Sequence, residues 1–428
     1  MNRLNRRAFI GTAAAGTAAM AKWGHSAAAD RKIKLGLIGC GWYGMVDCKA
    51  AFKVGDVETI AVCDVDSDHL QKSADEIEKL QNTRPKTFKD YRELLETPGL
   101  EALIIATPPH WHALPFIAAC GKGLDIYCEK PLAYDIREGR AMVDAAKKCG
   151  RIIQIGFQRR QSDAIREAGE YIRAGQAGKI IQVDVQIHYK AGMQDSTPQQ
   201  PPASLDWDLW CGPAPKLPYS PNIGHFQWRL EAAYGNGHLV DWGIHLIDAT
   251  RYILAETMPR SLQATGGLYY FKNQITTPDI LTAHFEFERC PVVWRHRIWG
   301  AVEFAPEVNN GIFFFGEKET IFVTDDKWII IPAGKENEKK VMKPQDSGDI
   351  AVKHISNFLE AVRTRKPPIC SPEDAFRSTA TVQLATIAYH TGSKIIWDEK
   401  TEQIVGHPEA AKRLKREYRE PWKHPYSI

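Results

Sequence analysis

Three side chains of this sequence have the types that move protons or stabilise negative charge: Lys130, Asp241 and His245. Asp241 and His245 are four residues apart in a stretch, His238 to Leu254, that reads as a helix, so we expect them to share one helical face. A lone helical histidine is more often a core residue than a catalyst. A carboxylate one turn earlier can orient the imidazole and raise its basicity, which favours catalysis.

Metal chemistry is not predicted here. No second histidine lies one turn before or after His245, so the paired-histidine spacing of a helical zinc site is absent. The chain has no other metal-ligand spacing, and we expect no metal.

Lys130 precedes Pro131 and follows a short predicted strand, Asp125 to Cys128. Proline restricts the residue before it and permits a cis bond, so such a turn can aim the lysine at a fixed point. An ordinary surface lysine is the alternative. The position of Lys130 at the end of a strand, on the same rim as the nucleotide site described next, favours a functional role.

The elements that position these groups begin with a nucleotide site. A buried strand, Ile33 to Ile38, runs into Gly39-Cys40-Gly41-Trp42-Tyr43-Gly44, a helix-compatible run follows, and a second strand, Glu58 to Cys63, ends at Asp64. In a dinucleotide fold Gly39 allows the tight turn, Gly41 the approach of the pyrophosphate, and Gly44 the packing of helix on strand. The phosphates would lie on the helix N-terminus.

Asp64 decides between the two nicotinamide cofactors. A carboxylate at this strand end accepts both adenosine-ribose hydroxyls and repels a 2′-phosphate. Asp66 and Asp68 add negative charge, and no arginine follows Asp64 directly. We therefore predict NAD rather than NADP; the alternative is that Asp64 only caps the next helix.

Alternating strands and helices continue to Gly156 and imply a parallel sheet with right-handed crossovers. Ligands of such sheets bind beyond the carboxyl ends of the strands. Four chemically useful residues stand at such ends: Gly39, Asp64, Thr107 and Lys130. Their coincidence on one rim is stronger evidence than any one motif.

These motifs together resemble the Gfo/Idh/MocA family of NAD(P)-dependent sugar and cyclitol oxidoreductases. The resemblance is carried by the glycine turn, by Ala61-Val62-Cys63-Asp64-Val65-Asp66, by Ala106-Thr107-Pro108 and by Glu129-Lys130-Pro131, and extends over nearly everything after Asp30. Matching the family's motifs assigns cofactor binding to Gly39, Gly41, Trp42, Tyr43, Gly44, Asp64, Thr107, Pro108, His110, Glu129 and Lys130.

The resemblance also assigns catalytic roles. It makes His245 the acid/base on the hydroxyl that loses or gains hydride, while Asp241 orients His245 or contacts the substrate. Lys130 would hold the same oxygen and stabilise developing negative charge. Further substrate contacts are expected from Gln158, Arg159, Trp207 and Arg229, in addition to Lys130, Asp241 and His245.

The second domain contains a long irregular segment, Ala191 to Asn222, rich in Pro, Gln and Ser. A loop of that length in a compact domain is usually functional, and relatives use it to cover the active site. Trp207 and Trp210 could stack on a sugar ring or simply anchor the loop.

The rest of the second domain predicts a sheet. Successive strands between Ser261 and Ile331 imply a large, mostly antiparallel open sheet, whose open face relatives use for subunit contacts. The expected fold is therefore α/β overall, with a Rossmann domain over residues 30–153 and an α+β domain over 154–428. We expect a homo-oligomer, and interpret the tail from Lys412 as a solvated face.

Residues 1–29 resemble a twin-arginine export signal, with Arg6-Arg7 before a weak apolar run and Ala27-Ala28-Ala29 before Asp30. Removing them takes away four basic residues and no acid, so the formal charge falls from +3 to −1, which argues against a nucleic-acid partner. No later run predicts a membrane span. Nine cysteines without a C-x-x-C pair are expected to be buried thiols.

The sequence thus predicts an exported, periplasmic NAD-dependent oxidoreductase acting on a small carbohydrate. Twin-arginine export moves folded proteins, and little NAD is free outside the cytoplasm, so we expect a tightly held cofactor reoxidised within each cycle. Two alternatives stay open: a redox-neutral NAD-dependent glycosidase or epimerase, and a non-enzymatic nucleotide-binding module, against which Lys130, Asp241 and His245 argue.

Overall fold

The structure is a computed structural model that describes residues 31–301, 308–345 and 348–426. The predicted export signal, residues 1–29, lies outside the described residues. Among the helices of the described ranges, none combines the length and apolarity that crossing a bilayer requires.

The first domain is built on a six-stranded parallel sheet in the order β3-β2-β1-β4-β5-β6. This is the doubly wound order of dinucleotide-binding folds, which places ligands beyond the carboxyl ends of the strands. The strands are β1 (Ile33–Ile38), β2 (Val57–Cys63), β3 (Lys86–Phe88), β4 (Ala102–Ile105), β5 (Asp125–Glu129) and β6 (Ile153–Gly156).

Helices cover both faces of this sheet, as its nearly continuous buried strands require. One face packs against α2 and α3 together with α10, which comes from much later in the chain; the other packs against α5 and α6. Their bounds are α2 (Trp42–Val54), α3 (Ser67–Gln81), α4 (Tyr91–Leu94), α5 (Ala113–Gly121), α6 (Ile136–Cys149) and α10 (Ile350–Thr364). Asp135 caps α6 by accepting from Glu138 N.

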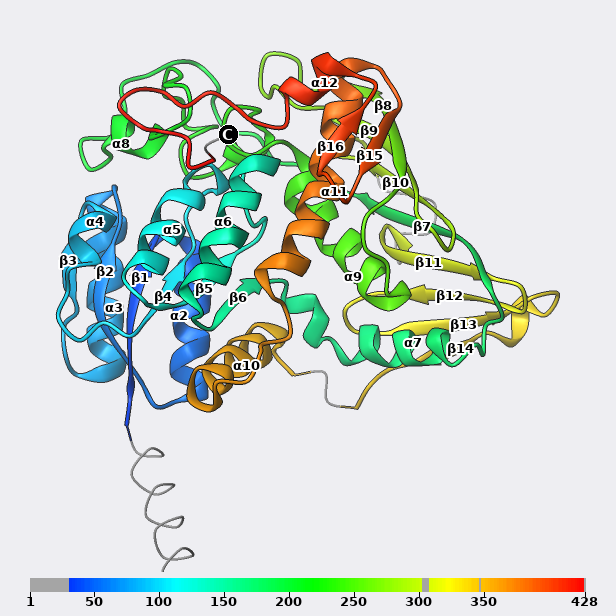
Figure 1. Ribbon diagram of the computed structural model, residues 1–428, viewed down its shortest axis with the longest axis horizontal. Helices are drawn as coiled ribbons and strands as arrows, with labels where there is room; N and C mark the ends of the chain where they lie inside the picture. The colour runs from blue at the N-terminus through cyan, green and yellow to red at the C-terminus, as the bar shows by residue number, and fades with distance from the viewer. Residues whose placement is uncertain (1–30, 302–307, 346–347, 427–428) are drawn as a thin grey trace, which may run out of the picture.

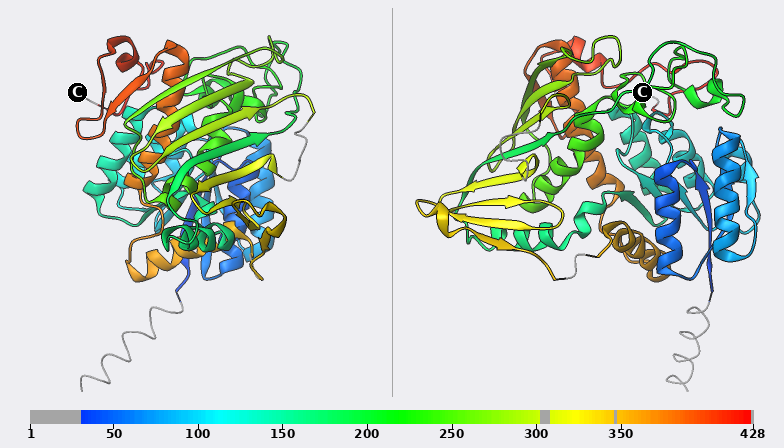
Figure 2. Two further views of the ribbon diagram at one scale, coloured as in Figure 1. Left: turned by 90° about the vertical axis from the view of Figure 1, so that its right-hand side faces the viewer. Right: turned by 180° about the vertical axis from the view of Figure 1, so that it is seen from behind.

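The second domain is built on a ten-stranded sheet in the order β14-β13-β12-β11-β7-β10-β9-β8-β15-β16, antiparallel except between β7 and β10. Figure 2 views its outer side in the left panel, with helices behind it. The strands are β7 (Ile180–His188), β8 (Ser261–Gly267), β9 (Ile280–Glu286), β10 (Pro291–Arg297), β11 (Asn310–Gly316), β12 (Glu319–Val323), β13 (Trp328–Pro332), β14 (Lys340–Met342), β15 (Ile395–Asp398) and β16 (Gln403–Val405).

The expected fold class, a Rossmann domain followed by a domain with a large, mostly antiparallel sheet, is confirmed. The helices of the second domain lie between its sheet and the first domain (Figure 1). They are α7 (Asp163–Arg173), α9 (Ile244–Leu254) and α11 (Pro372–Thr391); two shorter helices, α8 (Trp207–Cys211) and α12 (Pro408–Lys412), lie outside this layer.

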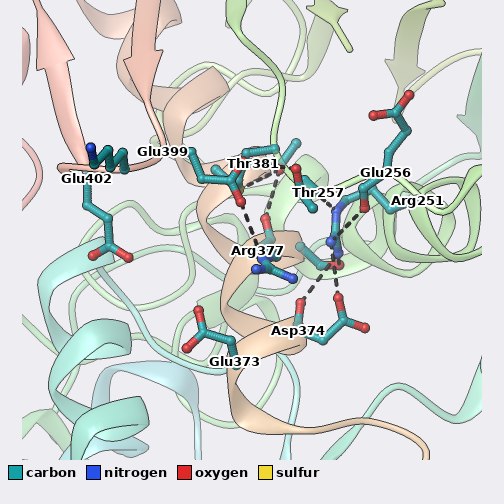
Figure 3. A network of polar contacts seen from close by, with 12 residues as sticks. Arg251, Glu256, Thr257, Glu373, Asp374, Arg377, Thr381, Glu399 and Glu402 are labelled. Atoms are coloured by element: carbon teal, nitrogen blue, oxygen red, sulfur yellow. Dashed lines mark hydrogen bonds and ion pairs between the residues drawn. The ribbon is translucent and has the colours of Figure 1, made fainter. Parts of the chain in front are cut away.

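Helix α9 carries His245 and is fixed at its far end by a buried arginine. Arg251, 2% exposed, donates to the Asp374 carboxylate of α11 at 3.1 Å (Figure 3). The same guanidinium donates to the backbone carbonyls of Glu256 and Thr257. This network holds α9 and the helix beside it in one register, which fixes where the start of α9 lies.

The segment Ala191–Asn222, called the cover segment below, lies over the carboxyl ends of the Rossmann strands (Figure 1). It is tied to the loop after β2 by backbone bonds from Ser67 N to Ser204 O (2.9 Å) and from Asp206 N to Val65 O (3.0 Å). Its position agrees with the covering role inferred from the resemblance.

The C-terminal tail is not a solvated face, and that interpretation was wrong. Arg416 donates to the Glu138 carboxylate, which is fully buried, at 2.7 Å, and to His110 O at 2.8 Å. Arg419 donates to Asp208 Oδ1 at 2.8 Å, on the cover segment. The tail lies beside α8 (Figure 1) and joins the cover segment to the Rossmann domain.

All nine cysteines are free thiols, and eight are buried. Burial raises the pKa of the Cys48 thiol to about 12. The expectation of small buried residues in place of a disulfide framework is confirmed.

Candidate active site

The glycine turn after β1 has the geometry that a dinucleotide needs. Gly39 has φ +90°, in the left-handed region that favours glycine, and a Cβ on Gly44 would lie 1.9 Å from Gly39 O. A Cβ on Gly41, by contrast, would meet nothing within 4 Å. Gly41 is also the N-cap of α2, which has no side-chain cap and no acid in its first turn. The free N–H groups and open space fit a pyrophosphate.

Asp64 stands at the end of β2, beside this turn. Its Oδ2 accepts from Cys40 N at 2.7 Å and its Oδ1 accepts from Asp66 N at 2.9 Å. Each carboxylate oxygen keeps a further lone pair for a ribose hydroxyl. Burial raises the pKa of Asp64, and the two backbone donors oppose that rise. Asp64 thus ties the glycine turn to the second strand and does not merely cap α3, which is capped by Asp66.

One cavity, of about 340 Å³, runs from the glycine turn to the second domain. Among the residues predicted to bind cofactor or substrate, those that line it are Gly39, Gly41, Trp42, Tyr43, Asp64, Thr107, Pro108, Arg229 and Asp241. The Thr107 hydroxyl is buried and has no hydrogen-bond partner in the protein, which leaves it available to a ligand. The cavity therefore joins the predicted cofactor and catalytic regions.

At the second-domain end of the cavity, Asp241 meets two cations. The Lys130 ammonium donates to Asp241 O at 2.8 Å and to Asp241 Oδ1 at 3.1 Å. Arg229 Nε lies 3.4 Å from Asp241 Oδ2. Lys130 and Asp241 are only 14% and 8% exposed, so their attraction is weakly screened. The predicted lysine and aspartate are brought together across the domain boundary.

Asp241 does not orient His245, and that part of the assignment was wrong. Residues Leu239–Gly243 form a π-helical turn directly before α9, so the α-helical spacing used for the prediction does not apply. The Asp241 carboxylate is taken by Lys130 and Arg229, while Nδ1 of His245 is buried without a partner. The alternative assignment, that Asp241 contacts the substrate, fits this geometry.

The His245 imidazole is held in its neutral form. Burial and the charges of Lys130 and Arg159 hold its pKa well below 6.5. A neutral imidazole can accept a proton at neutral pH, which a general base must do. Its ring centroid lies 6.2 Å from that of Trp242, which lines the cavity.

Two buried residues hold the turn that carries Lys130. Glu129 accepts from Lys130 N at 3.2 Å, and burial raises its pKa to about 7. The His112 ring nitrogens lie 2.8 Å from Pro131 O and from Thr107 O. His112 thus joins the end of β4 to the Lys130 turn. No motif pointed to His112, because this role depends on two loops meeting.

Eight of the predicted site residues are not in the cavity lining: Gly44, His110, Glu129, Lys130, Gln158, Arg159, Trp207 and His245. Two of these, His110 and Trp207, are held by contacts with residues of the cover segment. His110 is 1% exposed and its Nε2 lies 3.0 Å from Trp210 O, so it anchors the cover segment. Trp207 is 6% exposed and stacks on Trp210, with its indole N–H donating to Leu217 O. Neither reaches the space for a ligand, and the structure does not support their assignments to cofactor and sugar.

Gln158 and Arg159 lie behind the cavity lining. The Gln158 amide donates to the Tyr43 hydroxyl, and Arg159 pairs with Asp325 at 3.1 Å. The Arg159 guanidinium also lies over the Trp242 ring, 5.8 Å from its centroid. In this structure Gln158 supports Tyr43 and Arg159 supports Trp242, which both line the cavity, and neither Gln158 nor Arg159 lines it.

Several cavity-lining residues were not predicted. Tyr189 directly follows β7. Burial together with the Asp241 charge raises the pKa of its hydroxyl, so it stays a neutral donor. His225 Nε2 lies 2.9 Å from Asp66 Oδ2, and its ring packs on His69 at 4.4 Å. The high density of aromatic residues between positions 225 and 242 was the sequence feature that could have indicated that this segment lines the cavity.

The structure holds two groups of side chains of metal-ligating type within its described ranges. They are Asp66, His69 and His225, and Asp135, Glu138 and His424. In the first, the Asp66 oxygens already accept from Asp68 N and lie against His225. In the second, Glu138 pairs with Arg416. Both groups are satisfied by protein partners, and neither is assigned a metal.

Comparison with known proteins matches both halves of the chain to one family. Residues 33–157 match the oxidoreductase family model for an NAD-binding Rossmann fold, and residues 178–266 and 330–424 match that family's C-terminal alpha/beta domain. Together these matches cover well over half of the chain.

Individual relatives match this chain either over a shorter stretch or at lower sequence identity. The chain is 32% identical to an inositol 2-dehydrogenase/D-chiro-inositol 3-dehydrogenase of Lactiplantibacillus plantarum, over 36% of this chain but only 44% of that protein. It is 27% identical to an NAD⁺-dependent scyllo-inositol 2-dehydrogenase of Bacillus subtilis, over 74% of this chain and 83% of that one.

Solved structures share the whole fold. A levoglucosan dehydrogenase in complex with NADH and levoglucosan superposes with a TM-score of 0.67 at 18% identity, covering 86% of this chain and 99% of that one. At that identity the likeness shows the fold alone. The matched domains, with the glycine turn and Asp64 in the geometry of a dinucleotide site, place this chain in the Gfo/Idh/MocA oxidoreductase family, with an NAD-binding Rossmann domain at its N-terminus.

Proposed function

We propose that this protein transfers hydride between NAD and a hydroxyl-bearing carbon of a sugar or cyclitol. One observation carries the proposal: Lys130, from the nucleotide domain, is bonded to Asp241 of the second domain at one end of the cavity that begins at the glycine turn. A cofactor on that turn and a polyhydroxylated substrate at Asp241 would meet there. The inositol and levoglucosan dehydrogenases among the relatives support this substrate class.

Each residue of the site has a separate role in oxidation of the substrate hydroxyl. NAD would supply the hydride acceptor for oxidation of the substrate. His245, held neutral, takes the hydroxyl proton as the carbonyl forms. The Lys130 ammonium donates to the same oxygen and stabilises the negative charge that develops on it. Asp241 accepts from a neighbouring hydroxyl, and Arg229, paired with Asp241, donates to another.

The proposal extends to how the cofactor is held. The Arg6-Arg7 leader supports twin-arginine export and a periplasmic location, and export of a folded protein carries any bound NAD with it. The cover segment is bonded to the loop after β2, next to Asp64, and so stands over the adenosine end of the proposed site. We infer that NAD stays bound and is reoxidised in each cycle, by a second sugar or in a redox-neutral reaction.

The test is to purify the mature protein from the periplasm without added cofactor and to analyse the extracted nucleotide. Nearly stoichiometric NAD supports retention. Empty protein that works only with added NAD, and accumulates NADH in proportion to product, would indicate an ordinary dehydrogenase. A screen of inositols, levoglucosan and aldoses then identifies the substrate from transient absorbance of NADH.

A further inference from the structure

An aromatic rim surrounds the mouth of the active-site cavity. In the described part of the chain, the Trp and Phe side chains that are clearly exposed are Trp42, Phe226 and Trp242, at 75%, 40% and 41%. All three line this one cavity, and the partly buried Trp228 lines it too. Exposed rings gathered at one place mark a binding surface. The other large exposed rings of the described residues, Tyr269 and Tyr270, lie outside this cavity.

Trp242 is the rim residue nearest the catalytic groups. It follows Asp241 directly, and its ring centroid is 6.2 Å from that of His245. The Arg159 guanidinium lies over the ring at 5.8 Å, and Arg159 is itself held by Asp325 at 3.1 Å. The ring is therefore braced by a fixed cation while 41% of the residue stays open to solvent.

Trp228 also has an arginine over its ring. The Arg229 guanidinium lies 4.2 Å from the Trp228 ring centroid, and Arg229 Nε reaches Asp241 Oδ2 at 3.4 Å. Trp228 is thus linked to the Asp241 carboxylate through Arg229, and Trp242 is the next residue in the chain after Asp241. The polar groups at Asp241 bind hydroxyls, and the indoles beside them offer apolar faces.

Sugar rings present both kinds of surface. Their hydroxyls bond to carboxylates and guanidinium groups, and their C–H faces pack on indole rings. The ring that is oxidised must lie at Lys130 and Asp241, so the exposed part of the rim is left for whatever is attached to that ring. The aromatic rim thus extends the binding surface beyond the ring that is oxidised.

We propose that the aromatic rim, centred on Trp242 and Trp228, is a subsite for a second, glycosidically linked sugar ring. The preferred substrate is then an oligosaccharide or glycoside whose terminal ring is oxidised, and a free monosaccharide or cyclitol reacts less well. This inference rests on the proposed function, because it takes the ring at Asp241 to be the one oxidised.

The test compares matched pairs of sugars on the NAD-loaded full-length enzyme: glucose with cellobiose and maltose, galactose with lactose, and N-acetylglucosamine with its β-1,4 dimer. Calorimetry measures binding and transient NADH absorbance measures oxidation. We expect at least one disaccharide to bind and react at least 10-fold better than its monosaccharide. Trp242→Ala and Trp228→Ala should each reduce that preference by about 10-fold. Tyr270→Ala, at an exposed ring outside the cavity, is the matched control and should keep the preference.

Four results would overturn the proposal. Monosaccharides or cyclitols that react as well as every disaccharide would show that no second ring is bound, while leaving the proposed oxidoreductase intact. An unchanged preference in both tryptophan variants would place the second ring elsewhere. A lower oligomer mass for Trp242→Ala in analytical ultracentrifugation would make the rim a subunit contact. If no sugar or cyclitol binds or reacts, the proposed function fails and this inference fails with it.

Discussion

Lys130 and Asp241 form an ion pair between the two domains, with the Lys130 ammonium 3.1 Å from Asp241 Oδ1 and 2.8 Å from the Asp241 carbonyl oxygen. The lysine comes from the end of a parallel strand and the aspartate from a π-helical turn 111 residues later. π-Turns within helices are frequent at functional sites. Here the turn directs a carboxylate and a backbone carbonyl at one ammonium group.

Replacing Lys130 should greatly lower the rate of hydride transfer and leave NAD binding nearly unchanged. We expect Lys130→Met to lower kcat by about 100-fold or more, since it removes the cation that stabilises charge on the reacting oxygen. NAD affinity, measured by calorimetry, should change little because Lys130 is not part of the glycine turn. Lys122→Met, at an exposed surface pair with Glu96, is the control. Comparable turnover in Lys130→Met and the control would make Lys130 a structural residue.

His245→Ala should lower kcat by about 100-fold through loss of the general base. Near-normal turnover would return His245 to the status of a buried core histidine. His245→Gln, which keeps most of the volume, separates the loss of the base from the loss of packing.

The pH profile should show that His245 is held neutral by its burial and by nearby cations. Because its pKa lies well below 6.5, kcat/KM for oxidation should keep its full value as pH falls through 6.5. Removing a positive charge makes the imidazolium less unfavourable, so Arg159→Gln should raise this pKa and move the acid limb to higher pH. Arg159→Lys keeps the charge and should leave the limb in place. If the acid limb lies at the same pH in the wild type, Arg159→Gln and Arg159→Lys, the limb does not report the protonation of His245.

Asp64 should set the preference for NAD. Loss of charge-assisted bonds to ribose is worth about 1.5–3 kcal/mol, so Asp64→Ala should weaken NAD binding by roughly 10- to 100-fold and narrow its advantage over NADP. Asp64→Asn removes the charge and keeps one carbonyl oxygen, which can accept from Cys40 N or from Asp66 N but not from both, so its effect is compared with that of Asp64→Ala. A wild-type enzyme that prefers NADP would contradict this interpretation.

The tail should contribute to stability. Arg416→Ala would leave the buried Glu138 carboxylate without its cation, and breaking such a pair costs about 3 kcal/mol or more. The free energy of unfolding, from urea denaturation, should fall accordingly. Arg413→Ala, three residues earlier and exposed, should change it by less than about 0.5 kcal/mol. Equal effects of the two variants would restore the interpretation of the tail as a solvated face.

Local pattern predicted most of the fold because its elements are regular. The glycine turn, five of the six Rossmann strands and β8–β13 were found from apolar runs and turn residues, whereas β3, which is short and largely exposed, was not predicted. The strand β14 was missed because Lys340–Met342 is short and exposed, and its place depends on pairing with β13.

The site was harder to predict because it depends on distant contacts. The assignment of Asp241 to His245 failed at a π-turn that no residue pattern announced. Arg416 and Glu138 are 278 residues apart, and Trp207 turns into its own aromatic cluster. Motifs therefore identified the reactive residues, whereas the residues that contact them could be identified only from the three-dimensional structure.

The central claim is that a sugar or cyclitol reduces NAD on this protein through Lys130 and His245. The most direct measurement is a single turnover: NAD-loaded protein is mixed with each member of a sugar and cyclitol panel, and absorbance at 340 nm is followed in a stopped-flow instrument. We predict a rise of up to one NADH per protein with at least one compound, slowed about 100-fold or more in Lys130→Met and in His245→Ala. No rise with any compound, or equal rates in wild type and both variants, would contradict the account.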